Sequence, residues 1–141
     1  MQSNIYRLFV YGSLRSGMHN EVFTFISSYF ELEGMASVHG HLYDLGEYPG
    51  AVPSTGKDQI IGELYRIEDE ADFDWAMEQI DDYEGYVVSE GAASLFRREL
   101  VYVWFQNSSV LAWIYWYNRP VTGKTRIFSG DYVAYKMGLG K

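Results

Sequence analysis

Alternating apolar and polar residues recur in short runs along the chain, and these runs are rich in β-branched and aromatic residues. A period of two with such residues is typical of β-strands that bury one face. The pattern predicts strands at residues 5–11, 38–45, 59–67, 95–106 and 110–117. Asn107-Ser108 separates the last two runs, so we expect these two strands to form a hairpin.

Two further segments repeat apolar residues at the three- and four-residue spacing of an amphipathic helix. Asn20 can cap the first helix, which we expect to extend through Phe30. Asp69 or a neighbouring residue can cap the second. The apolar stripes of the two helices are Val22, Phe25, Ile26 and Tyr29, and then Phe73, Ala76, Met77 and Ile80.

The predicted order of elements is β-α-β-β-α-β-β, and most of the links have the length of hairpin loops. This order predicts an α+β fold in which a small, curled, mixed or antiparallel sheet packs against helices. The sequence contains no repeat, low-complexity tract or linker. We therefore expect residues 1–141 to form a single domain.

The composition of the chain argues against several kinds of binding partner and several kinds of catalytic or metal site. The net charge is −8, and the 11 Lys and Arg residues are scattered apart from Arg97-Arg98, which argues against a nucleic-acid partner. The chain has no cysteine, which excludes disulfides, thiol nucleophiles and zinc bound by thiolates. No leader sequence and no run of about 18 uncharged apolar residues is present, so we expect a cytoplasmic protein with no membrane partner.

A carboxylate continues the apolar stripe of the second predicted helix. Glu84 follows Ile80 by four residues, so it lies within about 40° of Ile80 around the helix axis, whereas Asp81 and Asp82 are expected to point away. Gly85 suits the left-handed residue after a helix end. Burial and the helix dipole would both raise the pKa of Glu84 toward the range of a general base. The alternative is a surface glutamate in an acidic run.

A turn that contains glycine follows the first predicted strand. In Tyr11-Gly12-Ser13-Leu14, successive backbone N–H groups can point into one concavity and bind a carboxylate or phosphate without a basic side chain. An ordinary strand-end turn is the alternative.

Other candidate motifs fail on spacing. The "VTGKT" segment lacks the first glycine of a phosphate-binding loop, which would fall at Asn118. Ser13 does not fit the GxSxG motif of a nucleophile elbow, which would need glycine at the positions of Tyr11 and Arg15. His39 and His41 share a strand face and could supply two metal ligands, but a catalytic zinc needs three from the protein. The sequence therefore predicts neither a metal nor a cofactor.

Taken together, the segments "VYGSLRSGMHN", "GEYPGAVP", "GELYRIE", "DDYEGY", "FRRELVYVW", "AWIYWY" and "SGDYVAY" occur in the order of a known family. They resemble the γ-glutamylcyclotransferase-like family, which includes γ-glutamylamine cyclotransferases and plant AIG2-like proteins. The resemblance covers nearly the whole chain, and its most specific signals are YGSL and DxxEG. It implies a small barrel-like sheet with helices around it and a substrate cavity at the YGSL turn.

The resemblance also implies roles for individual residues. Glu84 matches the catalytic glutamate, and the turn from Tyr11 to Leu14 matches the segment that holds the α-carboxylate and amine of a γ-glutamyl group. Tyr132 matches a C-terminal tyrosine that contacts substrate. Arg98 matches an arginine found after the glutamate in many members, and an ion-pair partner on a strand face is its alternative reading.

The implied reaction releases 5-oxoproline from a small-molecule γ-glutamyl amine or peptide, because the substrate's own α-amine attacks its γ-carbonyl. Such a reaction requires no metal and no covalent enzyme intermediate. Two alternatives remain open: a non-catalytic module that binds a small acid or peptide, and a cyclotransferase that acts on a carrier-tethered γ-glutamyl intermediate. The sequence leaves the oligomeric state undetermined.

Overall fold

The computed structural model describes residues 5–12, 21–85 and 94–138. Their strands are β1 (Arg7–Val10), β2 (Phe30–Asp44), β3 (Pro49–Pro53), β4 (Gln59–Ile67), β5 (Phe96–Phe105), β6 (Ser108–Tyr117) and β7 (Thr125–Ile127). The helices are α1 (Glu21–Tyr29), α2 (Phe73–Glu84) and α3 (Tyr132–Lys136), and the single 3₁₀ turn Glu70–Asp72 precedes α2.

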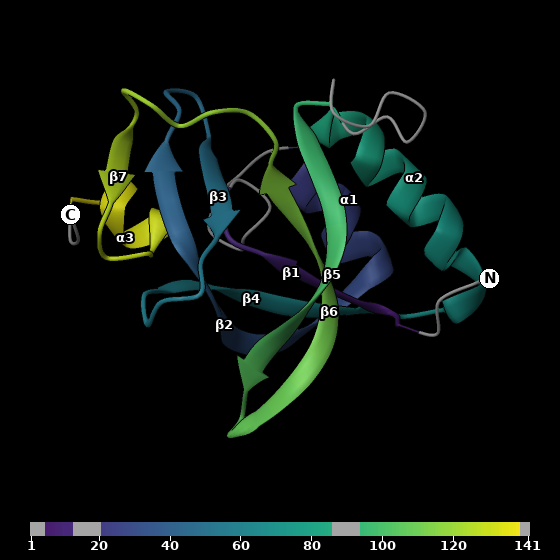
Figure 1. Cartoon of the computed structure of the whole chain (residues 1–141). Coiled ribbons are helices and arrows are strands. Elements are labelled where there is room, and N and C mark those ends of the chain that lie inside the picture. The colour runs from purple at the N-terminus through teal and green to yellow at the C-terminus, as the bar shows by residue number, and fades with distance from the viewer. Residues whose placement is uncertain (1–4, 13–20, 86–93, 139–141) are drawn as a thin grey trace.

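Five of the strands close into a barrel, in the order β2-β4-β1-β6-β5 (Figure 1). The ring closes where β5 pairs with β2 at Ser37 and Trp104. β1 runs parallel to β6, and the other neighbours in the ring are antiparallel, so the sheet is mixed. The expectation of a small, curled α+β sheet with flanking helices is confirmed.

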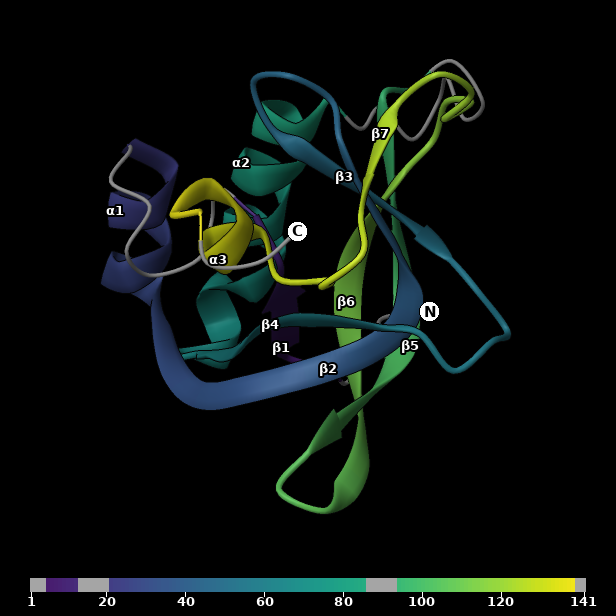
Figure 2. The ribbon, with the colours of Figure 1, turned by 90° about the vertical axis from the view of Figure 1, so that its left-hand side faces the viewer.

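The longest strand, β2, belongs to two parts of the sheet. Its first part pairs with β4 in the barrel, and its last residues, from Gly40 to Asp44, pair with β3 on one side and partly with β7 on the other. Figure 2 shows β2 curving from the end of α1 along the barrel toward β3. The strand thereby extends the sheet beyond the barrel, next to α3.

The alternating side chains of β1 separate two apolar cores. Leu8 and Val10 pack with the apolar faces of α1 and α2, whereas Phe9 and Tyr11 pack with residues of the barrel interior. Such alternation follows from the period of two in a strand. The end of β1 therefore reaches the boundary between the barrel and the helix layer.

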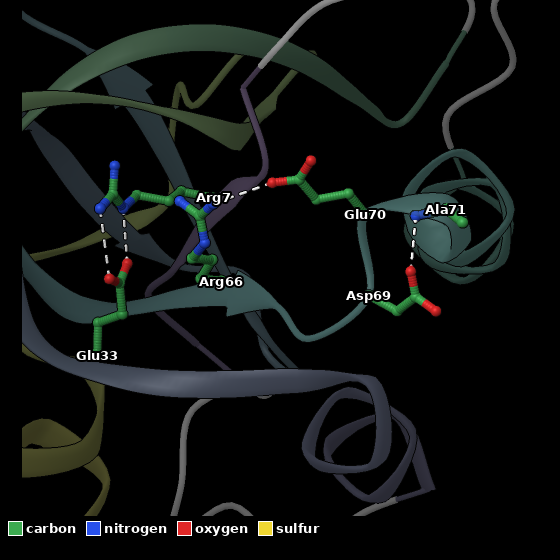
Figure 3. A network of polar contacts seen from close by, with 6 residues as sticks. All are labelled: Arg7, Glu33, Arg66, Asp69, Glu70 and Ala71. Atoms are coloured by element: carbon green, nitrogen blue, oxygen red, sulfur yellow. Dashed lines mark hydrogen bonds and ion pairs between the residues drawn. The ribbon is translucent and has the colours of Figure 1, made fainter.

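Charged residues occupy the outer surface of the barrel near α2 (Figure 3). Strand β2 has a one-residue β-bulge at Glu33, the extra residue between Leu32 and Gly34, which pair with consecutive residues of β4. The Glu33 carboxylate accepts a hydrogen bond from Arg7 Nε at 2.6 Å. Arg66, opposite Arg7 on β4, pairs with Glu70 at 3.1 Å. We call these four residues the surface ion-pair network.

Several predicted elements match the structure closely. The strand at 59–67 has the predicted bounds, and the predicted hairpin forms between β5 and β6, with positive φ angles of 49° and 63° at Gln106 and Asn107. Asp69 accepts a hydrogen bond from the N–H of Ala71 and so caps the 3₁₀ turn that leads into α2.

Other predicted elements were wrong in extent or missing. β2 begins at Phe30, eight residues before the prediction, because its bulge interrupts the alternation of apolar residues. β3, β7 and α3 were not predicted because they have only five, three and five residues, too few for a clear period. No helix among the described residues is long and apolar enough to span a membrane.

Candidate active site

A cavity of about 300 Å³ lies where the end of β1 approaches the end of α2. Residues from distant parts of the chain line it: Phe9, Val10, Tyr11, Gly12, Glu47, Tyr48, Pro49, Tyr83, Glu84, Leu95, Phe96 and Tyr115. Most are aromatic or apolar, and the two carboxylates are the charged groups among them. A cavity with apolar walls and a few polar groups is typical of a small-molecule site.

Glu84 occupies the last turn of α2 and lies partly buried in the cavity wall. The helix extends as far as Glu84, as its apolar stripe required, and the stripe residues Phe73, Ala76, Met77 and Ile80 are buried. Gly85 follows with a φ of 70°, and its N–H reaches the carbonyls of Asp81 and Asp82. The end of α2 thus presents a carboxylate to the cavity.

The environment of Glu84 favours its neutral form. Burial of the Glu84 carboxyl, together with the smaller effect of the negative charge of Asp81, raises its pKa from 4.5 to about 8. Both protonation states are therefore accessible near neutral pH. A carboxyl in this condition can accept a proton and return it within one reaction.

The prediction that Asp81 points away from the apolar face was wrong, whereas Asp82 is exposed as expected. Asp81 is 8% exposed, because β5 and β6 pack against this turn of α2 and supply partners for its carboxylate. Arg98 donates to it through Nε at 2.9 Å and through Nη2 at 3.1 Å. The Tyr115 hydroxyl donates to it at 2.6 Å.

Tyr11 connects β1 to two neighbouring strands. Its hydroxyl donates to the carbonyl oxygen of Tyr115 at 2.5 Å and accepts from the N–H of Ala51 at 3.3 Å. Burial, together with the charge of Glu84, raises the pKa of Tyr11 well above its ordinary value of 10. Tyr11 therefore stays neutral, and its hydroxyl fixes the end of β1 beside the cavity.

Gly12 lies against Pro49, and both residues line the cavity. A Cβ atom at Gly12 would lie 2.5 Å from Pro49 Cγ, closer than real contacts allow. A side chain here would displace the cavity wall. Ser13 and Leu14, the other predicted turn residues, lie outside the described residues.

Comparison with known proteins shows the family of this chain. The family model for γ-glutamyl cyclotransferase, AIG2-like proteins matches residues 8–134. The chain belongs to this family. The resemblance seen in the sequence is thereby confirmed, and the family as a whole is γ-glutamylcyclotransferase-like.

Two individual relatives are similar in sequence to this chain over most of its length. The chain is 35% identical over 128 residues to the "Gamma-glutamylcyclotransferase family protein YtfP" of Escherichia coli K12, covering 90% of this chain and 96% of that protein. It is 31% identical over 131 residues to the "Gamma-L-glutamyl-butirosin B gamma-glutamyl cyclotransferase" of Niallia circulans, covering 92% of this chain and 77% of that protein.

Solved structures share the fold. The solution structure of ytfP from Escherichia coli matches with a TM-score of 0.63 and 35% identity, over 92% of this chain and 98% of that one. YkqA from Bacillus subtilis matches with a TM-score of 0.69 and 25% identity, over 94% of this chain. This chain spans only 41% of YkqA, which is a longer protein.

The AIG2-like resemblance also implied that Tyr132 contacts substrate, but the structure does not bring it to the cavity formed by the described residues. Tyr132 begins α3, is 2% exposed, and packs in the barrel core with Tyr11 and Leu42. Asp131 caps this short helix through the N–H of Ala134. A structural role explains the position of Tyr132, and its contact with substrate stays a prediction.

Arg98 likewise does not line the cavity directly. It pairs with Asp81, which also accepts a hydrogen bond from the lining residue Tyr115, and its guanidinium lies 4.7 Å from the centre of the Trp113 ring. The two histidines considered as ligands lie on β2, where His41 Nε2 is 3.2 Å from Asp58 Oδ2. Within the described ranges, no three His, Cys, Asp or Glu residues are grouped to hold a metal ion.

Sequence reasoning missed much of the cavity wall. Glu47 and Tyr48 come from the link between β2 and β3, Pro49 begins β3, and Leu95 and Phe96 lie just before and at the start of β5. The aromatic residue and proline within "GEYPG" are the available signal for the first group. The second group had no local signal, since its place depends on the closure of the barrel.

Proposed function

We propose that this protein is a cyclotransferase that releases 5-oxoproline from a γ-glutamyl amine or γ-glutamyl peptide, with Glu84 as general acid and base. The observation that carries the proposal is the Glu84 carboxyl in the wall of a cavity of about 300 Å³, with a pKa raised to about 8. Membership of the γ-glutamyl cyclotransferase, AIG2-like family supports this type of reaction.

The proposed reaction begins with a proton transfer. The α-amine of the substrate is mostly ammonium near neutral pH, so a base must remove a proton before the nitrogen can attack. The ionised Glu84 carboxylate accepts that proton, and the free amine attacks the γ-carbonyl carbon. A new N–C bond forms, and the carbonyl oxygen gains negative charge.

The second half of the reaction returns the proton. As the tetrahedral intermediate collapses, the bond from the γ-carbon to the departing nitrogen breaks, protonated Glu84 supplies a proton to that nitrogen, and the new ring nitrogen releases its extra proton to solvent. The products are 5-oxoproline and a free amine. Glu84 ends in its starting ionised state, so the cycle needs no water or other reactant.

The substrate must also be held in a folded conformation, with its α-amine close to its γ-carbonyl carbon. We propose that the backbone N–H groups of the turn from Tyr11 to Leu14 hold the α-carboxylate. The described residues of the cavity wall include no Lys, Arg or His, so none of their side chains offers a positive charge to an anion, and backbone N–H groups can hold it instead. The adjacent Tyr115 and Phe96 supply apolar surface for the glutamyl chain.

The test is a panel of γ-glutamyl amines, γ-glutamyl amino acids and isopeptides, with released 5-oxoproline measured by mass spectrometry. We expect release from at least one class, and loss of that release in Glu84→Gln. Glu78→Gln is the matched control, because Glu78 lies exposed on the same helix. Binding of γ-glutamyl compounds without release of 5-oxoproline from any of them would contradict the enzyme and favour the binding module.

A further inference from the structure

The Asp81 carboxylate has more partners than a helix-surface residue needs. Both oxygens face the Arg98 guanidinium, at 2.9 Å and 3.1 Å, and Oδ1 also accepts from the Tyr115 hydroxyl at 2.6 Å. The side chains of Arg98 and Asp81 are only 19% and 12% exposed. Such two-point pairs are geometrically specific, and they are costly to break when buried.

These contacts join the carboxylate to the cavity. Asp81 and Glu84 lie one helical turn apart on α2, so they share a face of the helix. Tyr115 lines the cavity beside Glu84, and its backbone carbonyl accepts the hydrogen bond from Tyr11. One side chain of α2 thus fixes a strand of the barrel next to the proposed base.

We propose that Asp81 is a positioning residue for Glu84: together with Arg98 and Tyr115, it fixes one wall of the cavity and supplies the negative charge against which Glu84 gains and loses its proton. This inference rests on the proposed role of Glu84 as the base. It assigns a function to the aspartate of the DxxEG motif and, through it, to Arg98.

Among the residues that the structure describes, the other titratable groups around Glu84 leave Asp81 as the main source of charge. Tyr11, Tyr48 and Tyr115 each interact electrostatically with Glu84, and burial raises the pKa of each above 10, so all three are neutral at pH 8. Glu47 also lines the cavity, but it is exposed to solvent, which screens its charge.

The two members of the ion pair should therefore shift Glu84 in opposite directions. Asp81→Asn removes a negative charge and leaves the Arg98 cation unpaired, so ionisation of Glu84 becomes easier and its pKa falls by about one unit. Arg98→Gln leaves the Asp81 charge uncompensated, so the pKa of Glu84 rises. A purely structural pair would lower activity without this change of sign.

The experiment measures the pKa of Glu84 in each full-length variant by NMR, using protein with ¹³C-labelled glutamate carboxyls and Glu84→Gln to assign the signal. Asp82→Asn and Arg97→Gln are matched controls, since each neutralises the neighbouring residue outside the pair. We expect a fall for Asp81→Asn, a rise for Arg98→Gln and less than about 0.3 unit for the controls. Shifts of the same sign, or none beyond the controls, would overturn the proposal.

Arg98→Lys covers the case in which Asp81→Asn or Arg98→Gln does not fold. Lysine keeps the positive charge but cannot form the two-point pair, so the pKa of Glu84 should stay near its wild-type value while kcat falls. A pKa that moves as far as in Arg98→Gln would contradict the role given to charge. The NMR measurement needs no turnover, so it reports the influence of Asp81 on Glu84 separately from the release of 5-oxoproline. If the wild type released no 5-oxoproline, that result would count against the proposed function alone.

Discussion

Two groups of carboxylates paired with arginines lie on the same fold and differ in surroundings. In the surface ion-pair network, Arg66 and Glu70 approach to 3.1 Å with side chains 43% and 55% exposed. At the end of α2, Arg98 and Asp81 approach to 2.9 Å with side chains 19% and 12% exposed. The distances of these two pairs are nearly equal, so the difference between the pairs is access to solvent.

Solvent access decides what each group can do. Exposed ion pairs contribute about 0–1 kcal/mol to stability, because water screens the charges and the side chains lose freedom. At the end of α2, burial of the Glu84 carboxyl and, to a smaller extent, the charge of Asp81 raise the pKa of Glu84 to about 8. The fold gives one pair a small effect on stability and makes the other part of the proposed proton-transfer site.

The largest expected effect comes from removing the buried carboxylate. Glu84→Gln keeps the size and shape of the side chain, so we expect normal folding and a loss of 5-oxoproline release by about 10²–10⁴-fold, the usual scale for a general base. Steady-state kinetics on the best substrate would measure it. Retention of more than half of the wild-type rate would show that Glu84 is not the base.

A change of cavity shape should be nearly as severe. In Gly12→Val the new side chain meets Pro49, whose Cγ lies 2.5 Å from a Cβ at residue 12, so we expect activity to fall by about 10²-fold or more. Gly56→Val is the control, because the nearest atom to a Cβ there is Ser54 Oγ at 3.4 Å. Ser13→Ala should be mild if backbone groups hold the substrate. Equal kinetics for both glycine variants would refute the tight contact at Gly12.

The raised pKa of Glu84 also makes stability depend on pH. Folded Glu84 holds its proton up to about pH 8, whereas an unperturbed carboxyl loses it near 4.5, so the wild type should lose stability as pH rises through this window. Glu84→Gln lacks this loss. Above pH 8 it should exceed the wild type by on the order of 2–4 kcal/mol relative to their difference at pH 4. Urea unfolding at pH 4 and pH 9 measures this, and a pH-independent difference would contradict it.

The smallest effects are expected in the surface ion-pair network. Glu70→Gln should change the free energy of unfolding by less than about 1 kcal/mol, and Glu33→Gln should change it by more, because the side chains of Arg7 and Glu33 are only 30% and 22% exposed. Both should leave 5-oxoproline release unchanged, since neither residue lines the cavity. Thermal unfolding and kinetics at low and high salt would detect a departure. A tenfold loss of activity in either variant would show that the two regions are coupled.

Local patterns predicted the parts of the site that depend on one element. The helical stripe that ends at Glu84 and the glycine after it are properties of α2 alone, and both match the structure. The position of Asp81 was mispredicted, because a helical wheel counts apolar neighbours on its own helix. It cannot anticipate that β5 and β6 bring Arg98 and Tyr115 to the same turn.

The same distinction between local features and features that depend on distant residues applies to the fold. The hairpin of β5 and β6 and the strand β4 follow from alternation and turn residues close together in the sequence. The pairing of β2 with β5 at Ser37 and Trp104, which closes the barrel, joins residues far apart and leaves no local pattern. The cavity wall depends on that closure, so much of it could not be predicted from the sequence.

The most direct test of the contrast between the two regions is the titration of glutamate carboxyls by ¹³C NMR in the wild-type protein. We expect that one glutamate signal, absent from Glu84→Gln and present in Glu33→Gln and Glu70→Gln, titrates near pH 8. That result would show that burial at the end of α2 prepares Glu84 for proton transfer. A Glu84 signal that titrates below about pH 6 would contradict the account.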